Sequence, residues 1–298
     1  MHDPVQLSVV IPTFNNLQVL RQNLERWQRF GPGRANAYEI IVIEDGCHDA
    51  TPAFLAETAA TVWGRNHLRW FHEDDAHELI CTNRGIAEAK GSIILAWQDD
   101  MFVNTSWFVP ELVRTFERYQ DLGVLSLSRG LEYLPYDTPI ERWEDLYDDQ
   151  HIQSWIGPKP WNWFRLQEVD AVMRPWAVRR KCIEAVGRLD EAFRPTEWDE
   201  ADLCYRIRKA GWKIATYGYE RLGAYTHLGS TTLKMSDAYK AKVLRNGQLF
   251  HTRWDDTIRA EHPRHCRTWL RRASLAGWYH TLGRMGRFLL DNKGPASS

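Results

Sequence analysis

Short apolar runs and helical patterns alternate along the first hundred residues of the chain. Four runs rich in Val, Ile, Leu and aromatic residues are typical of strands buried in a parallel sheet. These runs are residues 7–12, 39–43, 68–71 and 93–97. Apolar residues at helical spacing predict helices between them, over residues 16–30 and 82–90. This alternation predicts right-handed βαβ units, and hence an α/β fold with a mostly parallel central sheet flanked by helices.

The second half of the chain has a less regular pattern. A long segment, residues 134–166, is rich in Pro and Trp, and an irregular segment of this length is usually functional or mobile. The elements expected outside it are strands at 124–127 and 213–217 and helices at 202–211, 236–254 and 268–290. We therefore expect a sheet domain over residues 1–230 and a helical extension over residues 231–298.

The composition is that of an ordinary globular protein, with 44% hydrophobic and 26% charged residues. A net charge of −1 gives the whole chain no electrostatic reason to bind nucleic acid. Five scattered cysteines without a Cys-x-x-Cys pair predict free thiols in a reducing compartment. Because the N-terminus lacks a signal-peptide pattern and no apolar run reaches about 18 residues, we expect a cytoplasmic location.

Two adjacent carboxylates, Asp99 and Asp100, end the apolar run of residues 93–97. Buried charge is costly unless it is paired or bound to a metal. The carboxyl end of a strand is also where open α/β sheets bind their ligands. Hard oxygen ligands there suit Mg²⁺ or Mn²⁺, which commonly hold substrate phosphates. The competing interpretation is that the two aspartates simply open a turn.

The motifs together resemble the family 2 glycosyltransferases, which have the GT-A fold. The similar segments are residues 7–15, 43–51, 83–91, 98–100, 198–206 and 211–212. The resemblance covers roughly residues 7–230. It implies a GT-A fold and an inverting, metal-dependent enzyme that moves a sugar from a nucleoside diphosphate, with UDP or dTDP favoured. The implied acceptor is a glycan or a lipid-linked sugar, and surface polysaccharide synthesis is the implied process.

The resemblance also implies a nucleotide-binding role for residues that follow the first strands. Asp45 would accept a hydrogen bond from a uracil or thymine N–H, and Pro12, Thr13 and Asn15 would line the base and ribose pocket. Arg84 would touch the diphosphate. The alternatives are ordinary turn capping for the residues after the strands and a solvated side chain for the arginine.

The same resemblance implies a site for Mn²⁺ or Mg²⁺. Asp100 would be a metal ligand, and His227 would be a further one, because neutral imidazole commonly binds metals. Gln98 stands where many relatives have an aspartate, and with Asp99 it would contact the ribose or the metal shell. The alternative for His227 is a structural histidine.

An inverting transfer needs one general base to take the proton of the acceptor hydroxyl. By the resemblance, Glu200 falls on the position of the base and Asp199 precedes it. The order here is Asp-Glu where relatives commonly have Glu-Asp, so both residues stay candidates. Either could instead serve at the start of a helix, where carboxylates are favourable. Asp202 and Arg206, four residues apart, predict a structural ion pair.

The Trp-rich stretch lies where acceptor loops occur in this fold. Trp155, Trp161 and Trp163 are expected to stack on an acceptor sugar or a lipid carrier, or else to form an apolar patch over the sheet. The segment 264–290 combines arginines with an apolar stripe. This pattern suits binding to the anionic inner face of a membrane or to an acidic partner. The alternative is that this stripe packs on the sheet domain.

Two other classes of protein compete with the enzyme. A relative that binds nucleotide sugars as a partner or scaffold, without catalysis, is favoured by Gln98 and by the Asp199–Glu200 order. A nicotinamide dehydrogenase would share the βαβ start of the chain. It would also need a Gly-x-Gly-x-x-Gly turn after the first strand, where residues 12–15 read Pro-Thr-Phe-Asn.

Overall fold

The computed structural model describes residues 5–32, 37–135, 140–147, 152–155, 164–229 and 236–272. Its strands are β1 (Leu7–Thr13), β2 (Tyr38–Asp45), β3 (Leu68–Glu73), β4 (Ile93–Ala96), β5 (Met101–Val103), β6 (Leu122–Ser126), β7 (Gly130–Tyr133), β8 (Ile152–Trp155), β9 (Gln167–Glu168), β10 (Ala171–Val172), β11 (Trp176–Arg179), β12 (Lys213–Thr216) and β13 (Tyr225–His227). Its helices are α1 (Leu17–Phe30), α2 (Thr51–Ala60), α3 (Val62–His67), α4 (His77–Glu88), α5 (Phe108–Arg118), α7 (Arg180–Val186), α8 (Asp199–Lys209), α9 (Asp237–Arg272) and the short 3-10 turns η1 (Trp143–Tyr147) and η2 (Glu191–Phe193).

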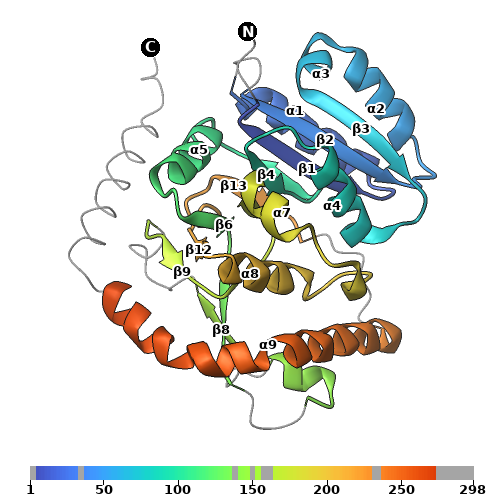
Figure 1. Cartoon of the computed structure of the whole chain (residues 1–298). Coiled ribbons are helices and arrows are strands. Elements are labelled where there is room, and N and C mark those ends of the chain that lie inside the picture. Colours follow the sequence, from blue (N-terminus) through green and yellow to red (C-terminus); the bar gives the residue numbers. More distant parts are fainter. Residues whose placement is uncertain are drawn as a thin grey trace.

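The central sheet has eight strands in the order β3-β2-β1-β4-β11-β6-β12-β9 (Figure 1). β1 pairs in parallel with both β2 and β4, and β2 pairs in parallel with β3. β11 is antiparallel to its neighbours β4 and β6, whereas β12 is again parallel to β6. The mostly parallel α/β sheet with flanking helices is therefore confirmed.

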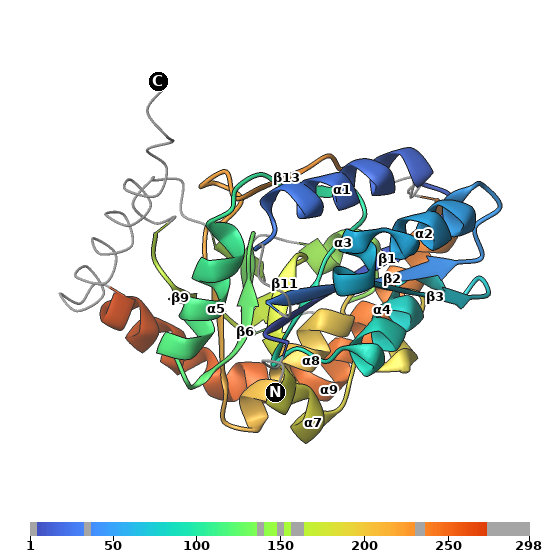
Figure 2. The ribbon, with the colours of Figure 1, turned by 90° about the horizontal axis from the view of Figure 1, so that it is seen from above.

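Alternate side chains of β1 enter two hydrophobic clusters, because successive side chains of a strand point to opposite faces of the sheet. Val9 and Ile11 lie in one cluster with Trp27 of α1, and residues of α2 and α5 complete it. Val10 lies in the other cluster with Ile86 of α4, beside residues of α7, α8 and α9. Figure 2 shows α1 on one side of β1 and β2, and α4 and α8 on the other. Helices thus cover both faces of the sheet, and a site can form at the ends of its strands.

The predicted elements of the first half are confirmed with one shift, since α4 begins at His77 and not at residue 82. Several elements were not predicted, among them α5, β11 and α7. The predicted break between residues 254 and 268 is wrong, because α9 is one helix over Asp237–Arg272. Its apolar stripe continues at helical spacing, and Phe250, Trp254 and Ile258 are all buried against α8 and the sheet.

The helical extension over residues 231–298 and the membrane contact of residues 264–290 stay predictions. Among the helices that the structure describes, none is long and apolar enough to cross a membrane. The division at residue 230 falls beside residues 230–235, which lie outside the described part of the chain. Residues 273–290, most of the segment expected at a membrane surface, also lie outside it.

Candidate active site

The turn after β4 carries the two adjacent aspartates and is held from two other elements. Thr13, at the end of β1, donates a hydrogen bond from Oγ1 to Oδ2 of Asp99 over 2.7 Å. Asn23, fully buried on α1, donates from Nδ2 to the carbonyls of Gln98 at 3.0 Å and Asp99 at 2.8 Å. Burial raises the pKa of Asp99 to about 6, although the bond from Thr13 opposes the rise. Thr13 and Asp99, at the ends of the neighbouring strands β1 and β4, thus meet at one edge of the sheet.

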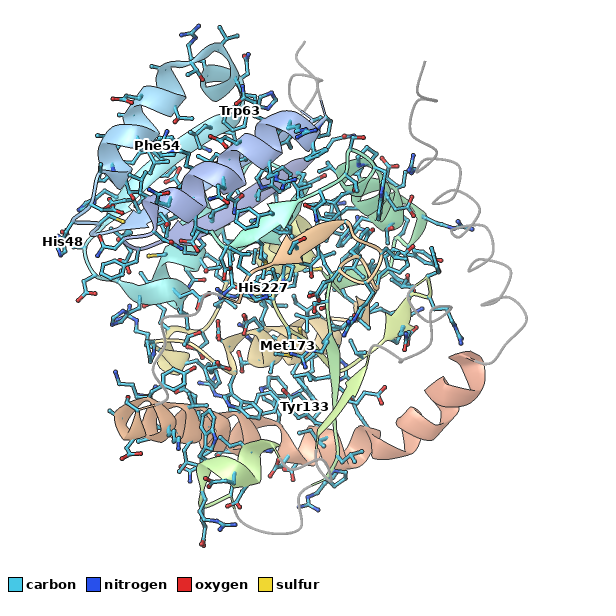
Figure 3. The ribbon with its side chains drawn as sticks, turned by 180° about the vertical axis from the view of Figure 1, so that it is seen from behind. His48, Phe54, Trp63, Tyr133, Met173 and His227 are labelled. Carbon is cyan, nitrogen blue, oxygen red and sulfur yellow. The ribbon has the colours of Figure 1, made fainter. Side chains whose placement is uncertain are left out.

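His227, labelled in Figure 3, lies beside Asp100, although 126 residues separate the two in the chain. β5 and β13 pair in antiparallel, and the Leu228 amide donates to the Asp100 carbonyl over 3.1 Å. The Asp100 Oδ1 and His227 Nε2 atoms are 3.4 Å apart. Asp100 is buried and His227 is about one-third exposed, so the pair opens to solvent on one side. One carboxylate oxygen and one imidazole nitrogen are a donor set that fits Mn²⁺ or Mg²⁺ with diphosphate oxygens as further ligands.

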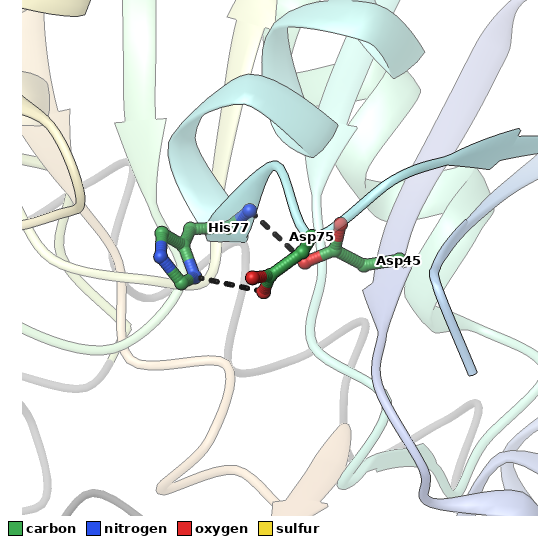
Figure 4. Close-up of side chains that lie close together, drawn as sticks. All are labelled: Asp45, Asp75 and His77. Atoms are coloured by element: carbon green, nitrogen blue, oxygen red, sulfur yellow. Dashed lines mark hydrogen bonds and ion pairs between the residues drawn. The ribbon is translucent and has the colours of Figure 1, made fainter. Parts of the chain in front are cut away.

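The end of β2 forms a second polar cluster, shown in Figure 4. Asp45 accepts backbone hydrogen bonds from Ala76 at 2.6 Å and His77 at 3.0 Å. Asp75 and His77 both adopt left-handed backbone conformations, with φ of 48° and 64°. One ligand atom from each of Asp45, Asp75 and His77 lies within 4.8 Å of the others, so the group could hold a cation. The sequence reasoning missed this group, although the run His-Glu-Asp-Asp-Ala-His-Glu at 72–78 is a signal for it.

The acidic pair begins α8, and the two carboxylates differ in exposure. Asp199 is fully buried, and neither of its carboxylate oxygens accepts a hydrogen bond from another described residue. Burial, and then the negative charge of Glu200, raise the pKa of Asp199 well above its ordinary value. The Glu200 side chain is 16% exposed and accepts a hydrogen bond from Arg174 Nε over 2.6 Å. Of the two, Glu200 is the carboxylate that can be approached from outside.

Arg174 connects the turn after β4 with the start of α8, and the sequence analysis did not predict it. Its buried guanidinium pairs with Glu200, with Glu78 of α4, and with Asp199, whose Oδ2 is 3.8 Å from Nη2. Gln98 in turn donates to Glu78 Oε1 over 3.3 Å. Burial acts to lower the pKa of Arg174, but the surrounding carboxylates together raise it, so the guanidinium stays charged. A single polar chain therefore runs from the turn after β4 to the start of α8.

The residues before α8, 192–198, form what we call the entry turn. Glu197 and Trp198 both have left-handed backbone conformations, with φ of 73° and 70°. Each such non-glycine residue costs about 1–3 kcal/mol and persists only where its surroundings hold it. Backbone strain of this kind lies directly before Asp199 and Glu200, the two candidates for the base.

The remaining predicted residues have mixed surroundings. The side-chain Oδ1 of Asn15 accepts hydrogen bonds from the backbone amides of His48 at 2.7 Å and Asp49 at 3.3 Å. This oxygen therefore links the ends of β1 and β2 as a turn cap does. Pro12 lies inside β1. Arg84 pairs with Glu88 at 3.2 Å on the outer side of α4, and its role at the diphosphate stays a prediction.

The acceptor prediction falls mostly outside the structure. Trp161 and Trp163 lie outside the described residues, and of Trp155 only the backbone, in β8 opposite Gly130, is described.

The predicted ion pair between Asp202 and Arg206 is confirmed, since Arg206 Nε donates to Asp202 Oδ2 over 2.8 Å. Trp254 of α9 also donates to Asp202, so this aspartate joins α8 to α9.

Burial also makes the stability of the protein depend on pH through Asp199. A carboxyl whose pKa is higher in the folded protein than its ordinary 3.8 binds more protons when folded, so its contribution to stability is lost as pH rises through the raised pKa. Asp199→Asn mimics the protonated acid. We expect the Tm of Asp199→Asn to exceed that of the wild type at pH 8, by about 2–4 °C for each kcal/mol of stability gained. At pH 4 the two Tm values should be equal. A lower Tm at pH 8 would contradict this.

The fold and the site together define a class of protein, the GT-A glycosyltransferase fold. Residues 8–186 match the family model described as Glycosyl transferase family 2. Because this match covers more than half of the chain, the protein belongs to that family. The match ends before α8, so Asp199, Glu200 and α9 lie beyond it.

Two named proteins among the matches are curated relatives. Glycosyltransferase AglD of Haloferax volcanii is 24% identical over 265 residues, which are 86% of this chain and 38% of that protein. An uncharacterized protein, y4gI of Sinorhizobium fredii, is 22% identical over 69% of this chain and 23% of its own length. The chain thus spans less than two-fifths of the length of these curated relatives.

Solved structures share the fold at low sequence identity. GalNAc-T7 with UDP, GalNAc and Mn²⁺ gives a TM-score of 0.56 at 14% identity, over 73% of this chain and 43% of that one. The mannosyltransferase PcManGT from Pyrobaculum calidifontis, in complex with GDP-Man and Mn²⁺, gives 0.52 at 14% identity, over 98% and 89%. At this identity the likeness shows the fold alone.

Proposed function

We propose that the protein is an inverting, divalent-cation-dependent glycosyltransferase with a nucleoside diphosphate sugar as its donor. The observation that carries this proposal is the polar chain that joins Gln98, beside the Asp100–His227 pair, to Glu200 through Glu78 and Arg174. Transfer needs a donor site and a base together, and this polar chain would connect the two. Two structural neighbours, one with UDP, GalNAc and Mn²⁺ and one with GDP-Man and Mn²⁺, support the same proposal.

The donor would bind along the carboxyl ends of β1, β2 and β4. Asp45 would accept the imide N–H of uracil or thymine, which is why UDP or dTDP is favoured, and its carboxylate is already oriented by two backbone amides. Thr13 and Gln98 would face the ribose. A divalent cation held by Asp100 and His227 would neutralise the charge of the departing diphosphate as a Lewis acid.

The acceptor hydroxyl would lose its proton to Glu200 as its oxygen bonds to the anomeric carbon of the donor sugar. The bond from that carbon to the diphosphate breaks at the same time, on the opposite face, so the configuration inverts. Asp199 is a poorer candidate for the base because it is fully buried. The acceptor that we propose is a glycan or a lipid-linked sugar, in surface polysaccharide synthesis at the inner face of a membrane.

A panel of UDP-, dTDP-, GDP- and CMP-sugars with Mn²⁺ tests the donor class by thermal shift. A specific donor at 100 times its Kd adds about 2.7 kcal/mol of stability, which is readily seen as a rise in Tm. We expect the largest rise with a UDP- or dTDP-sugar, and a clearly smaller one for Asp45→Ala. Equal shifts for all four nucleotides, or none, would contradict the donor assignment.

A non-catalytic binder of nucleotide sugars is the second candidate. The observation in its favour is the ion pair that already occupies Glu200, since a base must be free to take a proton. Donor hydrolysis by the wild-type protein with Mn²⁺ would exclude this candidate, whereas donor binding without hydrolysis or transfer would favour it.

A further inference from the structure

Asn246 of α9 holds the entry turn through its side chain. The residue is fully buried, and its Nδ2 donates to the carbonyls of Phe193 at 2.7 Å, Thr196 at 2.8 Å and Glu197 at 3.4 Å. A buried amide is costly unless it is hydrogen-bonded, and an apolar side chain here would leave these three carbonyls without this donor. The contacts of Asn246 are therefore directed at the turn and go beyond filling space.

The carbonyls between those three are held as well. Arg245, the preceding residue on α9, donates from Nη2 to the carbonyls of Ala192 at 3.0 Å and Arg194 at 2.8 Å. The Leu79 amide of α4 lies 3.4 Å from the carbonyl of Pro195. Each of the six carbonyls from residue 192 to 197 thus accepts a hydrogen bond from another helix, and five of these six hydrogen bonds come from α9.

The two residues with left-handed backbone conformations also contact α9 through their side chains. Glu197 accepts a hydrogen bond from the Tyr239 hydroxyl over 3.0 Å. The Trp198 ring lies 5.1 Å from the Phe250 ring and 5.5 Å from the His251 ring, measured between centroids. Strained backbone persists only where its surroundings determine it. Here those surroundings are largely one helix, and the next residues are Asp199 and Glu200.

We propose that α9 is a positioning element of the active site, and that Asn246 and Arg245 hold Glu200 in place by fixing the entry turn. The direction of the first turn of α8 follows from the backbone conformation of Glu197 and Trp198, so release of the turn moves the carboxylate. A displacement of about 1 Å at a reacting group can cost about 10² in rate. The inference rests on the proposed function, because it concerns the base named there.

Asn246→Asp is the first test, because the variant keeps the size of the side chain and loses the donor. We expect kcat for sugar transfer to fall at least about tenfold while the donor Kd stays within about twofold, since the donor contacts lie on β1, β2 and β4. The matched control is Ile258→Ala, which removes another buried α9 side chain three turns away. At equal Tm, the control should keep the wild-type kcat.

Arg245→Met is the second test and avoids a buried site, because Arg245 is exposed. Its control is Lys242→Met, an exposed residue on the same helix. Amide hydrogen exchange reads the turn directly. We expect faster exchange in residues 192–202 for Asn246→Asp and for Arg245→Met, unchanged exchange in β1 and β2, and no change in either region for Lys242→Met.

The outcomes separate this inference from the proposed function. Unchanged exchange at the entry turn in both variants would overturn the inference. So would faster exchange with a wild-type kcat, or a fall in kcat that Ile258→Ala reproduces. If the wild-type protein transfers no sugar from any donor, the proposed function fails, and the exchange comparison still decides whether α9 holds the turn.

Discussion

Replacing Glu200 with glutamine is expected to lower kcat by about 10²–10⁴, the usual contribution of a positioned general base. Glutamine has nearly the same shape but cannot take the proton of the acceptor hydroxyl. Arg174 Nε, which donates to Glu200 Oε1 over 2.6 Å, can still donate to the amide oxygen, so the side chain should keep its place. Donor binding should change little. The measurement is the rate of sugar transfer at saturating donor, with the donor Kd measured separately.

Asp199→Asn is the matched control for this variant. It makes the same chemical change one residue earlier, at a fully buried carboxylate whose pKa is raised well above its ordinary value. We expect it to keep turnover within about tenfold of the wild type, because a fully buried carboxylate is poorly placed to take the proton of an acceptor hydroxyl. Wild-type turnover in Glu200→Gln beside an inactive Asp199→Asn would move the base to Asp199.

The strands were predictable because their environment leaves a local mark. β1, β2 and β4 are covered on both faces by helices, so their central positions are apolar, and the runs stand out in the sequence. The ends of these strands then place Thr13 and Asp99 at one edge, where the structure has them hydrogen-bonded. What depends on continuous burial and on the order of parallel strands could thus be predicted.

The polar network could not be predicted, because its partners are distant in the sequence. Arg174 meets Glu78 and Glu200 from positions 96 and 26 residues away. It lies beside β11, a strand of four residues that is too short to carry a clear pattern. Nothing near Arg174 in the sequence distinguishes it from a solvated arginine. Only the antiparallel insertion of β11 between β4 and β6 brings it to the site.

The start of α4 and the course of α9 show two further limits. His77 has a φ of 64°, and Asp45 orients the amides of Ala76 and His77 that begin the helix. The start of α4 is therefore set by Asp45 of β2, and the apolar pattern of the local sequence predicted it five residues too late. In α9, burial against α8 continues past Trp254 to Ile258, so tertiary packing outweighs the weak apolar pattern that predicted a break.

Asp100→Ala is expected to abolish measurable transfer while the fold stays intact. A Lewis acid contributes several kcal/mol to the departure of a diphosphate, and each 1.4 kcal/mol is a factor of ten, so a loss of at least about 10³ follows. His227, whose Nε2 lies 3.4 Å from Asp100 Oδ1, would be left as a single protein ligand. The same variant should therefore also lose the rise in Tm that Mn²⁺ and donor give together to the wild type.

Chelation and a second carboxylate separate the cation from general effects of charge. Excess EDTA should remove transfer by the wild type, and added Mn²⁺ should restore it, whereas Asp100→Ala should stay inactive with either. Asp121→Ala, which removes an exposed carboxylate paired only with Lys213 among the described residues, should behave as the wild type in every arm. Full activity in EDTA would mean that the positive charge facing the diphosphate comes from the protein itself. Arg174, which stays charged and pairs with Glu78, would then be the side chain to replace next.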